Sequence, residues 1–251
     1  MNKTYLVSYC ENEDIDFLKT MLAPNDILVG VDQGADLLFK NFLTPDFIIG
    51  DFDSFPVNES KIPEKCQIIR LNPDKDESDL EYAVRYFLDR NDVLSNSKLK
   101  SCPDNDEVES NFAECESVAQ QREIIIINNM QGRIDHTLSV LGLLEQQYEL
   151  TNDSESMKSK NKTTICILNS ATEIYLSRGH FQKEILSNST ISLIPISDEV
   201  KKISTRGMLY ELDKETLYRK KTRGISNKNI DKNIAINFCV GELLVVINKR
   251  I

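Results

Sequence analysis

Hydrophobic residues in the first part of the chain form short, nearly continuous runs, and stretches with helical periodicity lie between them. The runs are TYLVSY (4–9), DILVGV (26–31), FIIG (47–50), QIIRL (67–71), EIIIIN (123–128) and TTICIL (163–168). Runs of this length with little polar alternation are typical of strands that are covered on both faces. Strands and helices in series predict a parallel α/β sheet.

The helical patterns have apolar residues three or four positions apart. They are EDIDFLKTML (13–22), GADLLFKNF (34–42), SDLEYAVRYFLDR (78–90) and DHTLSVLGLLEQQY (135–148). In the last of them Leu138, Leu141 and Tyr148 repeat on one helical face, which favours an amphipathic helix. A polar, acidic stretch at 91–122 predicts a surface insertion, and residues 151–162 predict a loop.

After about residue 170 the pattern changes to short alternating pieces separated by turn residues, such as TEIYLSRGHF, STISLIPI and ELLVVIN. These pieces indicate a small antiparallel unit, either a sandwich or a barrel. The expected fold class is therefore α/β, with an N-terminal Rossmann-like parallel-sheet domain at 1–170 followed by a small C-terminal all-β domain at 171–251.

Composition fits a soluble protein. The chain has 251 residues, of which 40% are hydrophobic, enough for a packed core. No run approaches the ~18 apolar residues of a membrane-spanning helix, and the N-terminus lacks a signal-peptide pattern, so no membrane association is expected. The cysteines are scattered without a C-x-x-C pair, which favours reduced thiols and a cytoplasmic location.

Charge is unevenly distributed along the chain. Residues 1–150 carry 13 basic against 29 acidic residues, whereas residues 151–251 carry 17 against 11. An acidic first part argues against a nucleic-acid surface there. The opposite signs also suggest that the two parts meet through complementary faces.

Polar loops follow four of the predicted strands, beginning at Asp32, Asp51, Asn72 and Asn129. The carboxyl ends of parallel strands share one edge of a sheet, so these loops should line one cleft. Asp51 and Asp53 point the same way if the segment is extended, and they suit a hard cation such as Mg²⁺. The bland alternative is an aspartate-rich turn.

Two basic side chains, Lys75 and Arg133, lie in the same loops, and arginine is shaped to bind phosphate oxygens. Carboxylates, a divalent cation, lysine and arginine together indicate phosphoryl transfer. No P-loop motif is present.

The pattern S-x-x-E at Ser78 predicts a capping box, which places Asp79 in the first turn of a helix. The alternative is that Asp79 only stabilises that helix. His136 is the weakest candidate, because a capping or buried histidine is more common than a catalytic base.

The motifs GVDQGAD, PDFIIGDFDS, DKDESDLEYAV and QGRIDHTLS, followed by TRGISN, resemble the thiamine pyrophosphokinase family in its bacterial form. The resemblance covers nearly the whole chain. It implies an enzyme, a thiamine diphosphokinase, that transfers pyrophosphate from ATP to thiamine with Mg²⁺ and releases AMP. It also implies a homodimer whose active site lies between subunits, with the α/β domain catalytic and the sandwich domain binding thiamine.

The resemblance also implies roles for individual residues. Asp51, Asp53 and Asp79 would organise metal and pyrophosphate. Beside them, Asp32 and Gln33 would lie next to the nucleotide, and Lys75 and Arg133 would lie near its phosphates. Asp135 would lie on the thiamine side, and Ser226 and Asn227 of the partner subunit would help form the thiamine pocket. Asp135 and Asp79 are the candidate bases.

Two glycines that the family usually carries are replaced here by Gln33 and Gln131. If either glycine normally allows close approach to phosphate, that contact changes. Two alternative functions stay open: a metal-dependent phosphatase with a D-x-D site, and a non-catalytic protein that binds nucleotide or thiamine.

Overall fold

The computed structural model describes residues 3–52, 62–97, 122–151 and 163–249. Its larger sheet has ten strands in the order β12-β9-β14-β7-β6-β5-β1-β2-β3-β4. The last six in this order are mutually parallel. They are β1 (Lys3–Val7), β2 (Ile27–Val31), β3 (Phe47–Gly50), β4 (Gln67–Arg70), β5 (Arg122–Ile127) and β6 (Thr163–Leu168). The apolar runs of the sequence therefore form these strands.

The helices connect the parallel strands. They are α1 (Asn12–Met21), α2 (Gln33–Lys40), α3 (Asp79–Ser97), α4 (Ile134–Gly142) and the 3₁₀ helix η2 (Leu143–Thr151). In the described part of the chain, no helix combines the length and the apolar character needed to cross a membrane.

Except for the edge strand β4, the parallel strands are buried on both faces, which explains why their sequences show no polar alternation. On β5, Ile124 and Ile126 pack in a core with residues of α3, α4 and η2. Ile125 and Ile127 pack in a second core with residues of α1 and α2. A run of β-branched residues suits such a strand because each side chain finds apolar neighbours on its own face.

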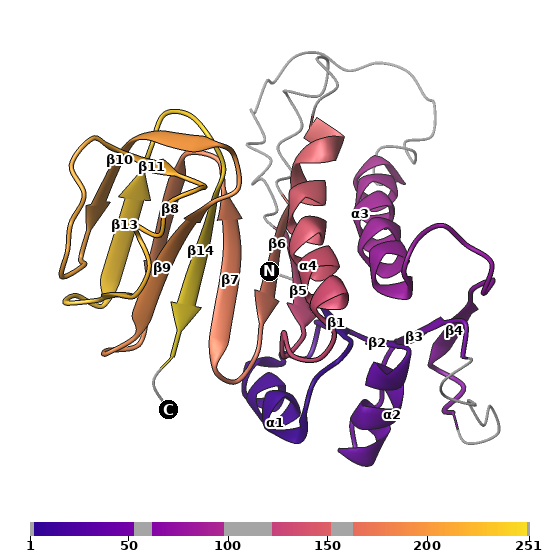
Figure 1. Ribbon diagram of the computed structural model, residues 1–251. Coiled ribbons are helices and arrows are strands. Elements are labelled where there is room, and N and C mark those ends of the chain that lie inside the picture. The colour runs from indigo at the N-terminus through magenta and orange to yellow at the C-terminus, as the bar shows by residue number, and fades with distance from the viewer. Residues whose placement is uncertain (1–2, 53–61, 98–121, 152–162, 250–251) are drawn as a thin grey trace, which may run out of the picture.

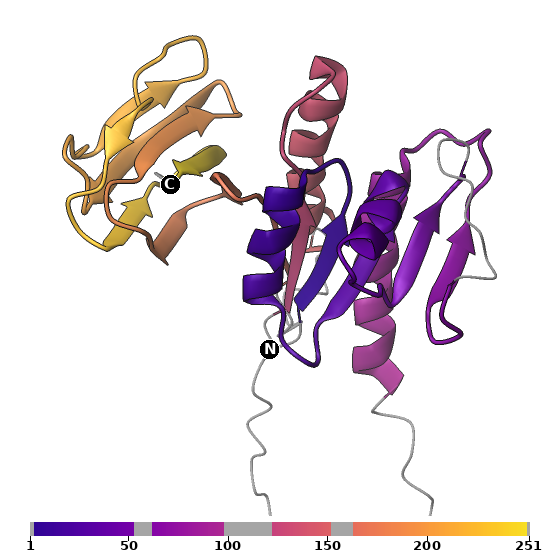
Figure 2. The same cartoon turned by 90° about the horizontal axis from the view of Figure 1, so that it is seen from below.

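The remaining strands form an antiparallel sandwich. They are β7 (Thr172–Ser177), β8 (His180–Glu184), β9 (Thr190–Pro195), β10 (Glu199–Arg206), β11 (Glu215–Tyr218), β12 (Asn227–Lys228), β13 (Asn233–Asn237) and β14 (Leu243–Asn248). A four-stranded sheet, β11-β10-β13-β8, packs on the antiparallel end of the larger sheet through a third core. Figures 1 and 2 show the sandwich beside the helix-covered strands.

One sheet runs through both parts of the molecule. Strand β7 pairs antiparallel with β6, and Ile167 lies opposite Ile174. Along β14, Leu244 belongs to the core under α3 and α4, whereas Leu243 and Val245 belong to the sandwich core. The fold is thus mixed α/β with a second, antiparallel sheet, and the change from parallel to antiparallel pairing falls at 169–171.

Two expectations from the sequence differ from the structure. Helix α3 continues to Ser97, so residues 91–97 of the predicted insertion are helical. The rest of that insertion, 98–121, and residues 152–162 lie outside the described residues. Leu138 is 60% exposed, because α4 buries Val140 instead and the chain then tightens into η2, which buries Leu143 and Leu144.

Candidate active site

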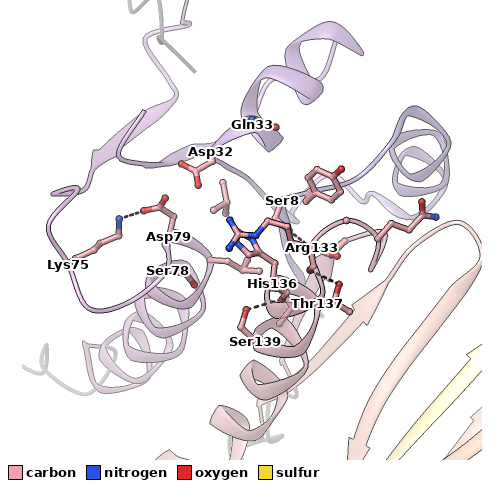
Figure 3. A pocket seen from close by; sticks show the side chains of 17 residues that line it. Ser8, Asp32, Gln33, Lys75, Ser78, Asp79, Arg133, His136, Thr137 and Ser139 are labelled. Carbon is pink, nitrogen blue, oxygen red and sulfur yellow. Dashed lines mark hydrogen bonds and ion pairs between the residues drawn. The ribbon is translucent and has the colours of Figure 1, made fainter. Parts of the chain in front are cut away.

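The carboxyl ends of the parallel strands surround a cavity of about 780 Å³. Its lining comes from the segments after β1, β2, β4 and β5: Ser8, Tyr9, Val31, Asp32, Gln33, Lys75, Ser78, Asp79, Leu80, Asn128, Gln131, Gly132, Arg133, His136, Thr137, Ser139 and Val140. Figure 3 shows Lys75 and Asp79 on one side of it and Ser8 and Arg133 on the other. The parallel sheet therefore gathers loops that are distant in sequence. Three of the four predicted loops contribute lining residues, whereas Asp51 and Phe52, the described residues after β3, do not.

Three carboxylates meet at this edge: Asp32, Asp51 and Asp79, which we call the acidic trio. One oxygen from each lies within 4.8 Å of the others. Asp32 directly precedes α2, Asp51 directly follows β3, and Asp79 is the first residue of α3. Carboxylate oxygens converging in this way are the ligands that Mg²⁺ or Ca²⁺ prefers, so the donor set fits a divalent cation.

Burial and mutual repulsion change the protonation of the trio. Burial, a hydrogen bond with Asp79 and the charges of Asp79 and Asp51 raise the pKa of Asp32 to about 8. A protonated Asp32 donates its hydrogen to the Asp79 carboxylate, and this arrangement lowers the negative charge at the site.

Lys75 is the cation that the chain itself supplies to the trio. Its Nζ lies 2.6 Å from Asp79 Oδ1 and 3.8 Å from an Asp51 oxygen. Burial alone lowers the pKa of the Lys75 amine, but the hydrogen bond with Asp79 and the charges of the three aspartates outweigh it and raise the pKa. Lys75 therefore stays charged in the pocket.

The backbone at Asp32 is strained, and Gly50 leaves the space that the Asp32 carboxylate occupies. Asp32 adopts φ 48° and ψ −122°, which is uncommon for a residue with a side chain. A Cβ at Gly50 would lie 2.3 Å from Asp32 Oδ1, so any larger residue there displaces the carboxylate. Phe52 and Met130, just after β3 and β5, also have positive φ. Such strain clusters at functional sites.

The serine half of the predicted capping box of α3 is present. Ser78 Oγ accepts a hydrogen bond from the Glu81 backbone N–H at 3.1 Å. The Glu81 carboxylate accepts a hydrogen bond from Gln146. This cap fixes the start of α3 and so the position of Asp79 in its first turn.

Asp135 does not join the trio. Its oxygens accept hydrogen bonds from Arg133 at 2.5 and 3.2 Å, and it is absent from the cavity lining. The hydrogen bond from Arg133 lowers the pKa of Asp135, and the same bond raises the pKa of Arg133. Arg133 itself lines the cavity, so Asp135 pairs with a lining residue without being one.

Ser226 and Asn227 lie in the sandwich, whereas all residues that line the cavity lie between positions 8 and 140 of the chain. Ser226 is exposed with φ 61°. The buried Asn227 side chain accepts the Tyr210 N–H and donates to the Tyr210 carbonyl at 2.8 Å. Within one chain, these two residues are therefore not brought to the trio.

Of the other expected site residues, Gln33 and His136 line the cavity, whereas Asp53 lies outside the described residues. Gln131 also lines it, and the neighbouring Gly132 keeps the left-handed backbone, φ 98°, that favours glycine.

Sequence reasoning missed the pocket residues Ser8, Tyr9 and Asn128. The first apolar run predicts a strand that continues to Tyr9, but β1 ends at Val7. The rule used for the other loops, that carboxyl ends of parallel strands share an edge, also applies to β1 and was sufficient to find Ser8 and Tyr9.

A sheet edge that gathers three carboxylates, a lysine and an arginine defines an α/β enzyme of the phosphoryl-transfer class. The family model of the thiamin pyrophosphokinase catalytic domain matches residues 18–154, and that of the thiamin pyrophosphokinase vitamin B1 binding domain matches residues 180–243. The chain belongs to the thiamin pyrophosphokinase family. It is therefore an enzyme that transfers pyrophosphate from ATP to thiamine, giving thiamine diphosphate and AMP.

Solved structures of that family share the fold. Thiamine pyrophosphokinase from Bacillus subtilis has a TM-score of 0.74 at 21% identity, with 100% of both chains covered. Thiamin pyrophosphokinase from Candida albicans has a TM-score of 0.70 at 20% identity, covering 99% of this chain and 89% of that one. Comparison with curated proteins finds no match. Neither alternative function gains support from these comparisons.

The raised pKa of Asp32 predicts how stability depends on pH. Because the folded pKa, about 8, exceeds the unfolded value of ~4, the folded state binds the extra proton and loses stability as pH rises from ~4 to ~8. Asp32→Asn removes this titration, and its amide can still donate to Asp79. Thermal unfolding at pH 8.5 in EDTA should give a Tm at least ~4 °C above wild type, and the gain should shrink towards pH 5.

Asp36→Asn is the matched control, because Asp36 lies in α2, which begins directly after Asp32, and pairs with Lys40 instead of joining the trio. It should leave the pH slope unchanged. An Asp32→Asn variant whose Tm falls with pH as steeply as wild type would contradict the assignment of the bound proton to Asp32.

Proposed function

We propose that the acidic trio holds Mg²⁺ and that the cavity beside it binds the phosphates of ATP. The observation that carries this proposal is the convergence of three carboxylate oxygens within 4.8 Å beside a partly buried lysine. A divalent cation at such a site neutralises phosphate oxygens and orients them for in-line displacement. Asp53, placed by the D-x-D motif, is proposed as a further ligand.

Lys75 and Arg133 are proposed to bind phosphate oxygens from opposite sides of the cavity. Figure 3 shows Lys75 on one side of the cavity and Arg133 on the other, with Asp32 between them. The thiamine hydroxyl oxygen attacks the β-phosphorus of ATP, a new O–P bond forms, and AMP leaves with the oxygen that bridged the α- and β-phosphates. Gln33, at the start of α2, is proposed to lie beside the nucleotide together with Asp32.

The hydroxyl proton needs a base. Asp79 is proposed for this role in preference to Asp135, since Asp79 lines the cavity and Asp135 does not. Asp135, which is ion-paired with Arg133, is proposed to orient Arg133 instead.

The functional assembly is proposed to be a homodimer in which the partner subunit's sandwich completes the thiamine pocket. Two features support this proposal: the cavity takes no lining residue from the sandwich, and apolar side chains remain exposed at its rim. Tyr9, Ile134 and Leu138 are 56%, 72% and 60% exposed. The net charges of the two parts of the chain are opposite, which favours contact between the acidic part of one copy and the sandwich of another.

The finer description of the fold stays a proposal too. We assign residues 1–170 to a Rossmann-like catalytic domain and residues 171–251 to a thiamine-binding sandwich, on the basis of the change in strand pairing at 169–171. A cytoplasmic location stays a prediction from the cysteine pattern.

Wild type should form AMP from ATP and Mg²⁺ only when thiamine is present, with thiamine diphosphate in equal amount. Asp51→Asn and Asp79→Asn should each lower kcat by roughly 10²-fold or more, because each removes charge from the proposed cation site. Asp53→Asn should do the same. The measurement is AMP and thiamine diphosphate by chromatography, with circular dichroism as a check that each variant is folded.

Asp16→Asn is the control for loss of a carboxylate, since the Asp16 side chain is 70% exposed and pairs with Lys19 on α1. It should keep wild-type kcat. Full activity in folded Asp79→Asn would remove Asp79 from the site, and AMP formation without thiamine would contradict the proposed reaction.

Mixing two inactive variants tests the shared site. Ser226→Trp adds bulk at an exposed sandwich position, and Asp79→Asn disables the α/β part. If the site combines residues of two subunits, random exchange gives half heterodimers with one intact site, and activity should recover to about a quarter of wild type.

The mixture is assayed after exchange in mild denaturant and return to buffer, with each variant treated alone as the control. Activity no higher than that of the separate variants would mean that the site lies within one chain. A fully active Ser226→Trp would remove Ser226 from the thiamine pocket.

A further inference from the structure

Asn128 is a buried polar residue of the pocket wall that the proposed chemistry does not use. It directly follows β5, lines the cavity and is 6% exposed. Its Nδ2 donates to Ser8 Oγ at 3.1 Å, and its Oδ1 accepts the Met130 N–H at 2.7 Å. Both ends of this amide are therefore occupied.

The first of these hydrogen bonds joins the loop after β5 to Ser8 in the loop after β1, and the second closes a turn within the loop after β5. The loops also share a backbone bond from the Asn129 N–H to the Tyr9 carbonyl at 3.0 Å. The Tyr9 ring lies against Gly132, and a side chain at position 132 would place its Cβ 3.3 Å from the ring. Together these contacts make one wall of the pocket, and Figure 3 shows Ser8 and Arg133 on that wall.

The loop after β5 needs this support because its backbone is not relaxed. Met130 has φ 57°, which is uncommon for a residue with a side chain, whereas Gly132 adopts φ 98° readily because it is a glycine. The Asn128 carboxamide oxygen closes an Asx turn over Met130, and Asn129 Oδ1 repeats the arrangement with the Gln131 N–H at 2.9 Å. Arg133 follows directly, so the direction of its side chain depends on this turn.

Asn128 is itself fixed by the end of the neighbouring strand β6 and the residue that follows it. Its carbonyl accepts a hydrogen bond from Asn169 Nδ2 at 3.1 Å, and its N–H donates to the Leu168 carbonyl. The Asn169 carbonyl in turn accepts from Lys249 Nζ at 2.7 Å. The loop is therefore anchored to the turn at 169–171, which joins the parallel and antiparallel parts of the sheet.

We propose that Asn128 is a positioning residue that holds the β5–α4 loop so that Arg133 meets the phosphates. The inference rests on the proposed function for the role of Arg133, but the holding of the loop can be measured separately. Small displacements of a group that binds the reacting phosphate reduce rate strongly.

The test combines hydrogen exchange with kinetics on Asn128→Ala. The Met130 amide loses its acceptor, so its exchange should become at least ~10-fold faster, and kcat/KM for ATP should fall roughly tenfold. Asn128→Asp keeps an acceptor for the same turn and should keep the Met130 amide protected. Ser8→Ala removes the acceptor of Nδ2 and should also speed exchange at Met130, which keeps the test available if Asn128→Ala does not fold.

Thr205→Val is the matched control, since Thr205 is 1% exposed in the sandwich and its Oγ1 accepts the Leu212 N–H at 2.9 Å. It should lower Tm yet leave Met130 exchange and kcat/KM unchanged. Wild-type exchange or wild-type kcat/KM in folded Asn128→Ala would overturn the proposal. If wild type itself forms no thiamine-dependent AMP, the proposed function fails, and exchange at Met130 alone decides whether Asn128 holds the loop.

Discussion

The repulsion among three carboxylates is the constraint on which the site depends. Asp32, Asp51 and Asp79 approach within 4.8 Å of one another because three segments end at the same edge of a parallel sheet. The chain offsets the repulsion with the Lys75 amine and with a proton shared between Asp32 and Asp79. A divalent cation at these oxygens would offset the repulsion more strongly than the amine or the proton does, so the trio is suited to the proposed cation.

The continuous sheet links this edge to the sandwich. Because β7 pairs with β6, and β14 contributes side chains to two cores, the sandwich is attached through hydrogen bonds and packing, not only through a linker. The cavity nevertheless draws its lining from residues 8–140. A second copy of the chain is the proposed source of the thiamine side, which assigns the sandwich a role in the partner's site.

The sequence predicted the parallel strands well, since a run such as β5 is buried on both faces and needs no polar alternation. It did not predict that Leu138 is exposed, because helical periodicity does not say where a helix tightens into η2. Nor did it place Asp32 in the trio, which requires the order of strands in the sheet. It also did not predict the ion pair between Arg133 and Asp135, which their spacing of two residues allows. The placement of Asp135 on the thiamine side stays a prediction.

The most direct test of this account is the number of protons released when Mg²⁺ binds. At pH 7 the pKa of Asp32, about 8, leaves the trio holding most of one proton, which a cation at those oxygens must displace. Titrating MgCl₂ into weakly buffered protein with a pH indicator should therefore release close to one proton per chain, with less at pH 9. Saturable Mg²⁺ binding without proton release at pH 7 would mean that the cation binds elsewhere, and the acidic trio would lose its assigned role.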